Sequence, residues 1–280
     1  MKLQYLGTAA AEGMPAIFCE CALCTQAAKL GGKNIRLRSG ALLNDHILID
    51  ASPDLYAAKL RLGLNLSPVR NIVITHAHMD HFNRETLAMF TEPYAHIRNR
   101  GMLHLWGSHF TAVAWEEYLH SSCIKEPQLA EEIEFHELKP FDLFEVGGVT
   151  FTALPAVHSC PDSLIYLCEQ NGSKLLYGND TGLFREDVWQ YLLAHNSTPL
   201  TAVSLDSTMG LPPSNYNGHM TFEQNVQIRE RMLREKLATP STQFLCHHFS
   251  HNGLALHQQA EALMNPKGFE VAYDGLIVTA

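Results

Sequence analysis

Four potential metal ligands lie within six residues in the segment NIVITHAHMDHFNRET. An apolar run that ends at Thr75 is followed by His76, His78, Asp80 and His81. Alternate residues that leave a strand project to one side, so His76, His78 and Asp80 can converge, and His81 adds a fourth group at the start of an expected helix. Imidazoles and carboxylates suit Zn, Mn or Fe, and a site rich in both suits a pair of metals. The segment therefore predicts a metal centre.

The elements around this segment alternate between short apolar strands and amphipathic helices. We expect strands over 3–7, 41–44, 46–52, 71–75, 102–106, 132–136, 149–155, 164–169, 174–178, 200–205 and 243–246, and helices over 53–63, 83–91, 110–120, 184–194, 221–236 and 255–263. Some neighbouring strands form hairpins, because QNGS supplies an Asn-Gly turn. The pattern predicts an α/β (α+β) fold, a four-layer αββα sandwich of two mixed sheets with helices outside. No linker or repeat divides residues 1–280, so we expect one domain.

Composition limits the class of partner. The net charge is −9 and no stripe of Lys or Arg is present, which argues against a long nucleic acid but leaves a small phosphorylated substrate open. No apolar run approaches the roughly 18 residues that cross a membrane. The start MKLQYLGTAAAEG lacks the apolar core of a secretory signal, so we expect a cytoplasmic protein.

The pattern His-x-His-x-Asp-His at 76–81 resembles the metal motif of the metallo-β-lactamase superfamily. LGTAAAEGMP resembles the Gly-rich opening loop of the phosphodiesterase branch, and ILIDASPD resembles the strand that ends in a buttressing aspartate, here Asp50. The resemblance extends over nearly the whole chain. It implies the metallo-β-lactamase fold, with further ligands in a lone histidine, a bridging aspartate and a final histidine.

Each later ligand has a candidate. His158 in TALPAVHS and Asp180 in LLYGNDTG follow apolar runs, although a loop histidine and a turn aspartate are the plainer alternatives. His247 and His248 in FLCHHFSHNG compete for the last position. His248 is preferred because HFS resembles the closing motif of the family, and His247 is held in reserve.

By resemblance, two divalent ions (Zn or Mn, or Fe) occupy the active site. One is held by His76, His78 and His158, the other by Asp80, His81 and His248, and Asp180 bridges them. Such a pair activates a water to hydroxide near neutral pH.

The leaving alkoxide also needs a proton. His219 in NGHMTFEQN lies just before a helix whose N-cap we expect at Thr221, and GHMT resembles the motif that carries a general-acid histidine in the phosphodiesterase branch. The plainer alternative is a solvent-exposed histidine before a helix. Asp80 and His219 are thus the expected catalytic residues of a phosphodiesterase acting on a small diester, with a cyclic one favoured.

Three cysteines form Cys-x-Cys-x-x-Cys at Cys19, Cys21 and Cys24. They cannot all pair as disulfides, but they can occupy three corners of a tetrahedral structural zinc site. His251 lies three residues beyond His248, so one imidazole could face the catalytic metals and the next the cysteines. Three reduced thiols in the core are the alternative. The remaining cysteines are interpreted as buried thiols: Cys123, Cys160, Cys168 and Cys246.

With the cysteine pattern included, the motifs most resemble the cyclic phosphodiesterases of the carbon–phosphorus lyase pathway, the PhnP family. A hydrolase of lactones or thioesters remains an alternative, as does an accessory protein similar to protein B of pyrroloquinoline quinone biosynthesis. tRNase Z is disfavoured because its tRNA-gripping arm has no room between His158 and Asp180. Homodimerisation is expected only by analogy. His104 and His109 flank LWGS, and a substrate contact there has no motif to support it.

Overall fold

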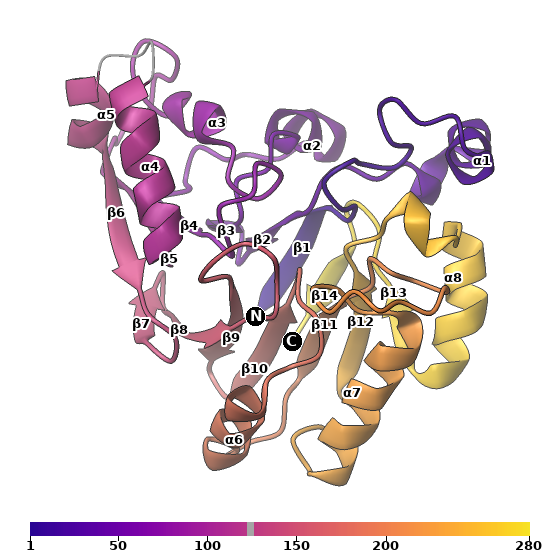
Figure 1. Cartoon of the computed structure of the whole chain (residues 1–280). Coiled ribbons are helices and arrows are strands. Elements are labelled where there is room, and N and C mark those ends of the chain that lie inside the picture. The colour runs from indigo at the N-terminus through magenta and orange to yellow at the C-terminus, as the bar shows by residue number, and fades with distance from the viewer. Residues whose placement is uncertain (122–125) are drawn as a thin grey trace.

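A computed structural model describes residues 1–121 and 126–280 and shows two sheets packed face to face (Figure 1). The first sheet has the order β14-β1-β2-β3-β4-β5-β6. Its strands are β1 (Lys2–Gly7), β2 (Gly40–Leu43), β3 (Ile47–Ile49), β4 (Asn71–Val73), β5 (Leu103–Ser108), β6 (Ile133–Leu138) and β14 (Ile277–Thr279). β3 to β6 run parallel, whereas β14, β1, β2 and β3 pair antiparallel. The sheet is therefore mixed.

The second sheet has the order β13-β12-β11-β10-β9-β8-β7. Its strands are β7 (Leu143–Val146), β8 (Val149–Pro155), β9 (Leu164–Gln170), β10 (Ser173–Gly178), β11 (Ala202–Asp206), β12 (Gln243–His247) and β13 (Phe269–Val271). The expected hairpin joins β9 to β10, where Asn171 (φ 50°) and Gly172 (φ 79°) adopt the two positive φ angles of a tight hairpin turn. β10 to β13 are parallel, so this sheet is also mixed.

Helices cover the outer faces of both sheets (Figure 1). They are α2 (Leu55–Leu62), α3 (Arg84–Ala88), α4 (His109–Ser121), α5 (Glu126–Glu132), α6 (Glu186–Ala194), α7 (Phe222–Arg234) and α8 (His257–Met264), whereas α1 (Ala22–Leu30) packs through Ala27 against the loop after β1. One apolar cluster lies between the first sheet and α2 to α5, and another lies between the second sheet and α6 to α8. A third, with Tyr5, Phe151 and Tyr166 fully buried, fills the space between the sheets. The four-layer αββα prediction is confirmed.

Chain segments that leave the strands bring the polar residues to one end of the sandwich. Asp50 directly follows β3, and Asp206 and His247 are the last residues of β11 and β12. His76, His158 and Asp180 follow β4, β8 and β10 within three residues. Because neighbouring parallel strands end at the same edge, side chains that are distant in sequence meet there. No helix among the described residues has the length and apolar character needed to cross a membrane.

Candidate metal centre

Three histidines and one aspartate form the first group of potential metal ligands. His78 Nδ1 lies 3.0 Å from His76 Nε2 and 3.1 Å from His158 Nε2. Asp180 closes the group, with Oδ2 3.3 Å from His76 Nε2 and Oδ1 3.4 Å from His158 Nδ1. The potential ligand atoms all lie within 4.8 Å of one another, so these four side chains could hold one metal ion.

A second group lies directly beside the first and is fully buried. His81 Nε2 is 3.1 Å from Asp80 Oδ2, 3.1 Å from Asp180 Oδ2 and 3.3 Å from His248 Nε2. Here too the four potential ligand atoms all lie within 4.8 Å of one another. Asp180 belongs to both groups, so a carboxylate lies where a bridge between two ions would be needed.

Unusual backbone conformations aim three of the side chains at the cluster. Asp50 (φ 67°), Asp180 (φ 51°) and His248 (φ 59°) have the left-handed conformation that residues other than glycine adopt infrequently. Each lies in the sharp turn at or just after the end of a strand. Such strain persists where the surrounding structure fixes a side chain, and it is common at functional sites.

Hydrogen bonds to Asp50 decide how two of the histidines are oriented. Asp50 accepts hydrogen bonds from His81 Nδ1 at 2.7 Å and from the Thr75 hydroxyl at 2.9 Å. Because the hydroxyl hydrogen is used on Asp50, Thr75 Oγ1 accepts from His76 Nδ1, 3.0 Å away. In their neutral forms both His76 and His81 then present Nε2 lone pairs to Asp180 Oδ2. Lone pairs that face a carboxylate repel it unless a cation lies between them, and this arrangement fits a metal site.

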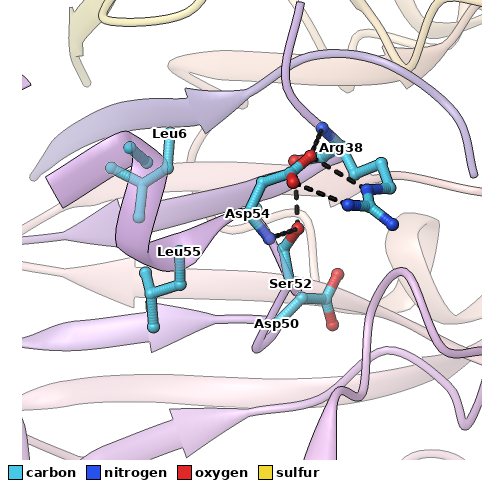
Figure 2. Close-up of a pocket in the computed structure, with 8 residues that line it drawn as sticks. Leu6, Arg38, Asp50, Ser52, Asp54 and Leu55 are labelled. Carbon is cyan, nitrogen blue, oxygen red and sulfur yellow. Dashed lines mark hydrogen bonds and ion pairs between the residues drawn. The ribbon is translucent and has the colours of Figure 1, made fainter. Parts of the chain in front are cut away.

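An ion pair behind the site anchors the loop that carries Asp50 (Figure 2). Asp54 accepts two hydrogen bonds from the Arg38 guanidinium, at 2.6 and 2.9 Å, and one from its backbone N–H at 2.8 Å. The Ser52 hydroxyl accepts from the Asp54 backbone N–H at 3.2 Å. Figure 2 shows the Asp50 carboxylate directed away from this pair, which leaves it free to orient Thr75 and His81.

Negative charge dominates the buried cluster. Asp50, Asp80, Asp180 and Asp206 are all at most 3% exposed. Burial alone would lower the pKa of His81, but Asp80 and Asp50 outweigh it and raise that pKa well above its ordinary value. Burial lowers the pKa of His76 to about 4. Buried carboxylates need compensating charge, which either protons on the histidines or divalent cations can supply. The donor set fits the second source.

His247 and His248, the two candidates for the last metal ligand, point in different directions. His248 faces the cluster, and its Nδ1 lies 2.7 Å from Thr208 Oγ1. His247 is fully buried in the opposite direction, with Nε2 3.2 Å from the Gly7 carbonyl and its ring 4.7 Å from that of Tyr5. His247 thus packs between the sheets, away from the cluster.

His219 lies at the edge of the cluster, held by two carboxylates. Its Nδ1 is 2.9 Å from Asp180 Oδ1 and 3.0 Å from Asp206 Oδ2. Burial lowers the pKa of His219, but the carboxylates reverse the shift and raise it to about 11. The expected N-cap is confirmed, because Thr221 and Gln224 form a capping box at the start of α7. The cap fixes the backbone that carries His219.

Asp206 is a site residue that the sequence analysis did not select. It accepts hydrogen bonds from the backbone N–H groups of Thr208 and Met220, at 3.0 and 2.9 Å, and lies 3.5 Å from His248 Nδ1. It therefore contacts both His219 and His248. The available signal was a carboxylate at the end of the apolar run TAVSLD, the same signal that drew attention to Asp50 and Asp180.

A cavity of about 420 Å³ opens over both groups. Its lining includes His78, Asp80, His158, Asp180, His219 and His248, together with Glu12, Ser159 and Asn252. A space of this size admits a small molecule rather than a folded polymer.

The cysteine cluster lies beside this cavity. Cys19 Sγ and Cys21 Sγ are 3.4 and 3.5 Å from His251 Nδ1, and Cys24 Sγ lies within 4.8 Å of all three atoms. The hydrogen bond with His251 lowers the pKa of Cys21 to about 6, which favours the thiolate that binds metals. His251 Nε2 faces Glu12 at 3.7 Å, so the cluster also contacts the cavity wall. Cys160, Cys168 and Cys246 are buried free thiols, whereas Cys123 lies outside the described residues.

Residues 45–248 match the model of a protein family described as the beta-lactamase superfamily domain. The chain belongs to this superfamily. Membership indicates a metal-dependent hydrolase, and the fold implies binding of divalent metals. The curated protein coenzyme PQQ synthesis protein B of Methylobacterium radiotolerans is 30% identical over 116 residues, which cover 37% of this chain and only 38% of that relative.

Solved structures share the fold along the whole chain. A diphosphatase from the PhnP family is 23% identical with a TM-score of 0.75, and the match covers 100% of this chain and 97% of the other. Zinc-bound PqqB from Methylobacterium extorquens is 16% identical with a TM-score of 0.71 and full coverage of both chains. The short form of human tRNase Z is 16% identical with a TM-score of 0.66, covering 100% and 99%. At these identities the three structures show that the fold is shared.

Proposed function

We propose that this protein is a phosphodiesterase that hydrolyses a small phosphate diester in a site for two divalent metals. His76, His78 and His158 would hold one ion, Asp80, His81 and His248 the other, and Asp180 would bridge them. The bound ions would supply Lewis-acid charge to phosphate oxygens and lower the pKa of water in the cavity. Zn, Mn or Fe suits this donor set. The chain's own residues orient the ligands and supply the proton for the leaving group.

The observation that carries the proposal is the position of His219. Its Nδ1 contacts Asp180 and Asp206, which leaves Nε2 as the nitrogen that can donate to a ligand in the cavity. A leaving alkoxide needs a proton as the P–O bond breaks, and an imidazole whose Nδ1 is directed to the Asp206 carboxylate can supply one from Nε2. A cationic imidazole beside the metal groups also stabilises a transition state with negative charge on several oxygens.

Two features favour a small phosphorylated substrate. The cavity is compact, and the chain has a net charge of −9, so a long nucleic acid would be repelled outside the site. A diphosphate linkage demands the same chemistry, and a structural neighbour is a diphosphatase of the PhnP family. A lactone or thioester hydrolase is the alternative, because the hydrolysis of carbonyl substrates can also use such a metal pair.

A substrate panel tests the proposal. The metal-loaded protein should hydrolyse bis-p-nitrophenyl phosphate and at least one of a 2′,3′-cyclic nucleotide, ribose 1,2-cyclic phosphate and a diphosphate ester, faster than a lactone or a thioester. Hydrolysis of the lactone or the thioester alone would favour the alternative function, a hydrolase of carbonyl substrates. A fully loaded protein inert toward every substrate would favour an accessory role of the kind suggested by the PQQ synthesis relative.

Matched substitutions should affect metal binding and activity at His248 but only folding stability at His247. His248→Ala should release about one equivalent of active-site metal and lower diester hydrolysis about 10²-fold or more. His247→Ala should retain the metal and lower the free energy of unfolding by about 2–4 kcal/mol, because it leaves a cavity between the sheets. Metal analysis and urea unfolding measure both effects. Metal loss from the His247 variant alone would show that His247, and not His248, is the metal ligand.

We also propose that Cys19, Cys21, Cys24 and His251 hold a structural zinc ion. Cys19→Ser should release one zinc per chain and lower the free energy of unfolding by about 4 kcal/mol, at a free zinc concentration about 1,000-fold above the dissociation constant. Cys168→Ala is the control, because it removes a buried thiol of the apolar core between the sheets and should retain full zinc content. Equal zinc contents in the two variants would contradict this site.

A further inference from the structure

A further cluster of ligand-type side chains lies at the opposite end of the first sheet. His104 is on β5, and Glu134 and His136 are on the adjoining strand β6. In the parallel register His104 pairs with Asn71, the first residue of β4, whereas the candidate metal centre follows the last residue of that strand. The two sites are therefore separated by the length of β4 and its following turn. Neither His104 nor His136 lines the cavity described above.

Three potential ligand atoms converge in this cluster. His104 Nδ1 lies 2.9 Å from His136 Nε2 and 3.2 Å from Glu134 Oε2, and the latter two atoms are 3.6 Å apart. Atoms with these separations lie on a circle of about 1.9 Å radius, so an ion about 2.1 Å from each would lie just out of their plane. The remaining coordination positions would face solvent, since the side chains are 33%, 52% and 28% exposed in the order His104, Glu134, His136.

The strand register places these residues together, and an aromatic stack fixes the His136 ring without help from an ion. His104 pairs with Glu134, and Trp106 with His136, in the register between β5 and β6. The Trp106 ring stacks on that of His136 with centroids 4.0 Å apart and an interplanar angle of 15°. Trp106 is itself fixed by a stack with Phe144 and by a hydrogen bond from its Nε1 to Asn71 Oδ1 at 3.2 Å. Preorganised ligands of this kind lose little conformational entropy when a metal binds.

Hydrogen bonds within the cluster alone cannot satisfy all three of its polar atoms. His104 Nδ1 faces both His136 Nε2 and Glu134 Oε2, but one N–H can be directed to only one of them. A cation would satisfy all three atoms together. We propose that His104, Glu134 and His136 form a surface site for a borderline divalent cation such as Zn²⁺ or Ni²⁺, independent of the proposed catalytic function. Two imidazoles and a carboxylate are the ligands that such ions prefer.

Equilibrium dialysis of the metal-loaded protein against micromolar free Zn²⁺ tests the proposal. Wild-type protein should bind one zinc per chain more than the double variant His104→Ala/His136→Ala. His109→Ala is the matched control, because it removes an exposed imidazole that pairs with a single carboxylate, 3.0 Å away on Glu137. The control should match the wild type. Equal zinc contents in all three proteins would overturn the proposal.

One further variant and one NMR measurement keep the result independent of folding. Glu134→Gln retains the shape of the side chain and both histidines. It should lower the affinity for the additional zinc ion at least ten-fold, while the circular dichroism spectrum stays unchanged. In NMR spectra, ring-proton signals of His104 and His136 should shift together on zinc addition, and those of His109 should not. Shifts confined to His109, or undiminished zinc affinity of the Glu134 variant, would exclude the three-ligand site.

Discussion

Asp180→Asn should lower phosphodiester hydrolysis by about 10³-fold or more, equivalent to about 4 kcal/mol of transition-state stabilisation. Asp180 is the one residue that contributes to both metal groups, and its carboxylate also contacts His219. Asparagine keeps the size of the side chain but removes the charge and one potential ligand oxygen. We therefore expect a loss of at least one metal equivalent together with the loss of rate, measured by metal analysis and steady-state kinetics on the same sample.

Asp162→Asn is the control for this substitution. Asp162 is exposed in the segment between β8 and β9, and it too has a positive φ angle, 53°, that asparagine tolerates. Its replacement should leave both rate and metal content within about two-fold of the wild type. An Asp180 variant that retains both ions and full activity would contradict the bridging role.

His219→Ala should produce a loss that depends on the leaving group. With an alkyl or ribose leaving group we expect the rate to fall about 10²–10⁴-fold, because the alkoxide must be protonated as it departs. With bis-p-nitrophenyl phosphate we expect a fall of about ten-fold or less, because p-nitrophenolate departs with little protonation. The comparison of rates for the two substrates isolates proton donation from general damage to the site.

Two companion variants sharpen this comparison. Asp206→Asn should show the same leaving-group dependence in weaker form, because Asp206 holds His219 and helps to keep it charged. Tyr216→Phe retains the ring that packs 5.5 Å from His219 and should change neither rate markedly. Equal losses on both substrates for the His219 variant would remove its role as an acid.

The local motif could be predicted from the sequence because its residues are close together in the chain. His76 to His81 follow a single strand, and period-two geometry alone brings them to one side. The choice among distant partners needed the family resemblance, since spacing alone does not show that His158, Asp180 and His248 meet. The structure brings all seven proposed ligands of the two ions together, and the four members of the cysteine cluster as well.

What the sequence analysis missed has physical reasons. Asp206 lacked a motif, and its role depends on a register between β11, β12 and the loop that leads into α7. β13 and β14 have only three residues each, too few for periodicity to identify. The cluster on β5 and β6 was invisible because His104 meets Glu134 and His136 only through the pairing of two strands.

Reconstitution of the active site with metal tests the central claim most directly. Protein stripped of active-site metal, with zinc retained at the cysteines, should be titrated with Mn²⁺, which prefers nitrogen and oxygen ligands to thiolates. Diester hydrolysis should stay low up to one equivalent of bound Mn²⁺ and rise steeply as the second binds. Full activity at one equivalent, or no diester hydrolysis at two, would contradict a phosphodiesterase that works with a pair of ions.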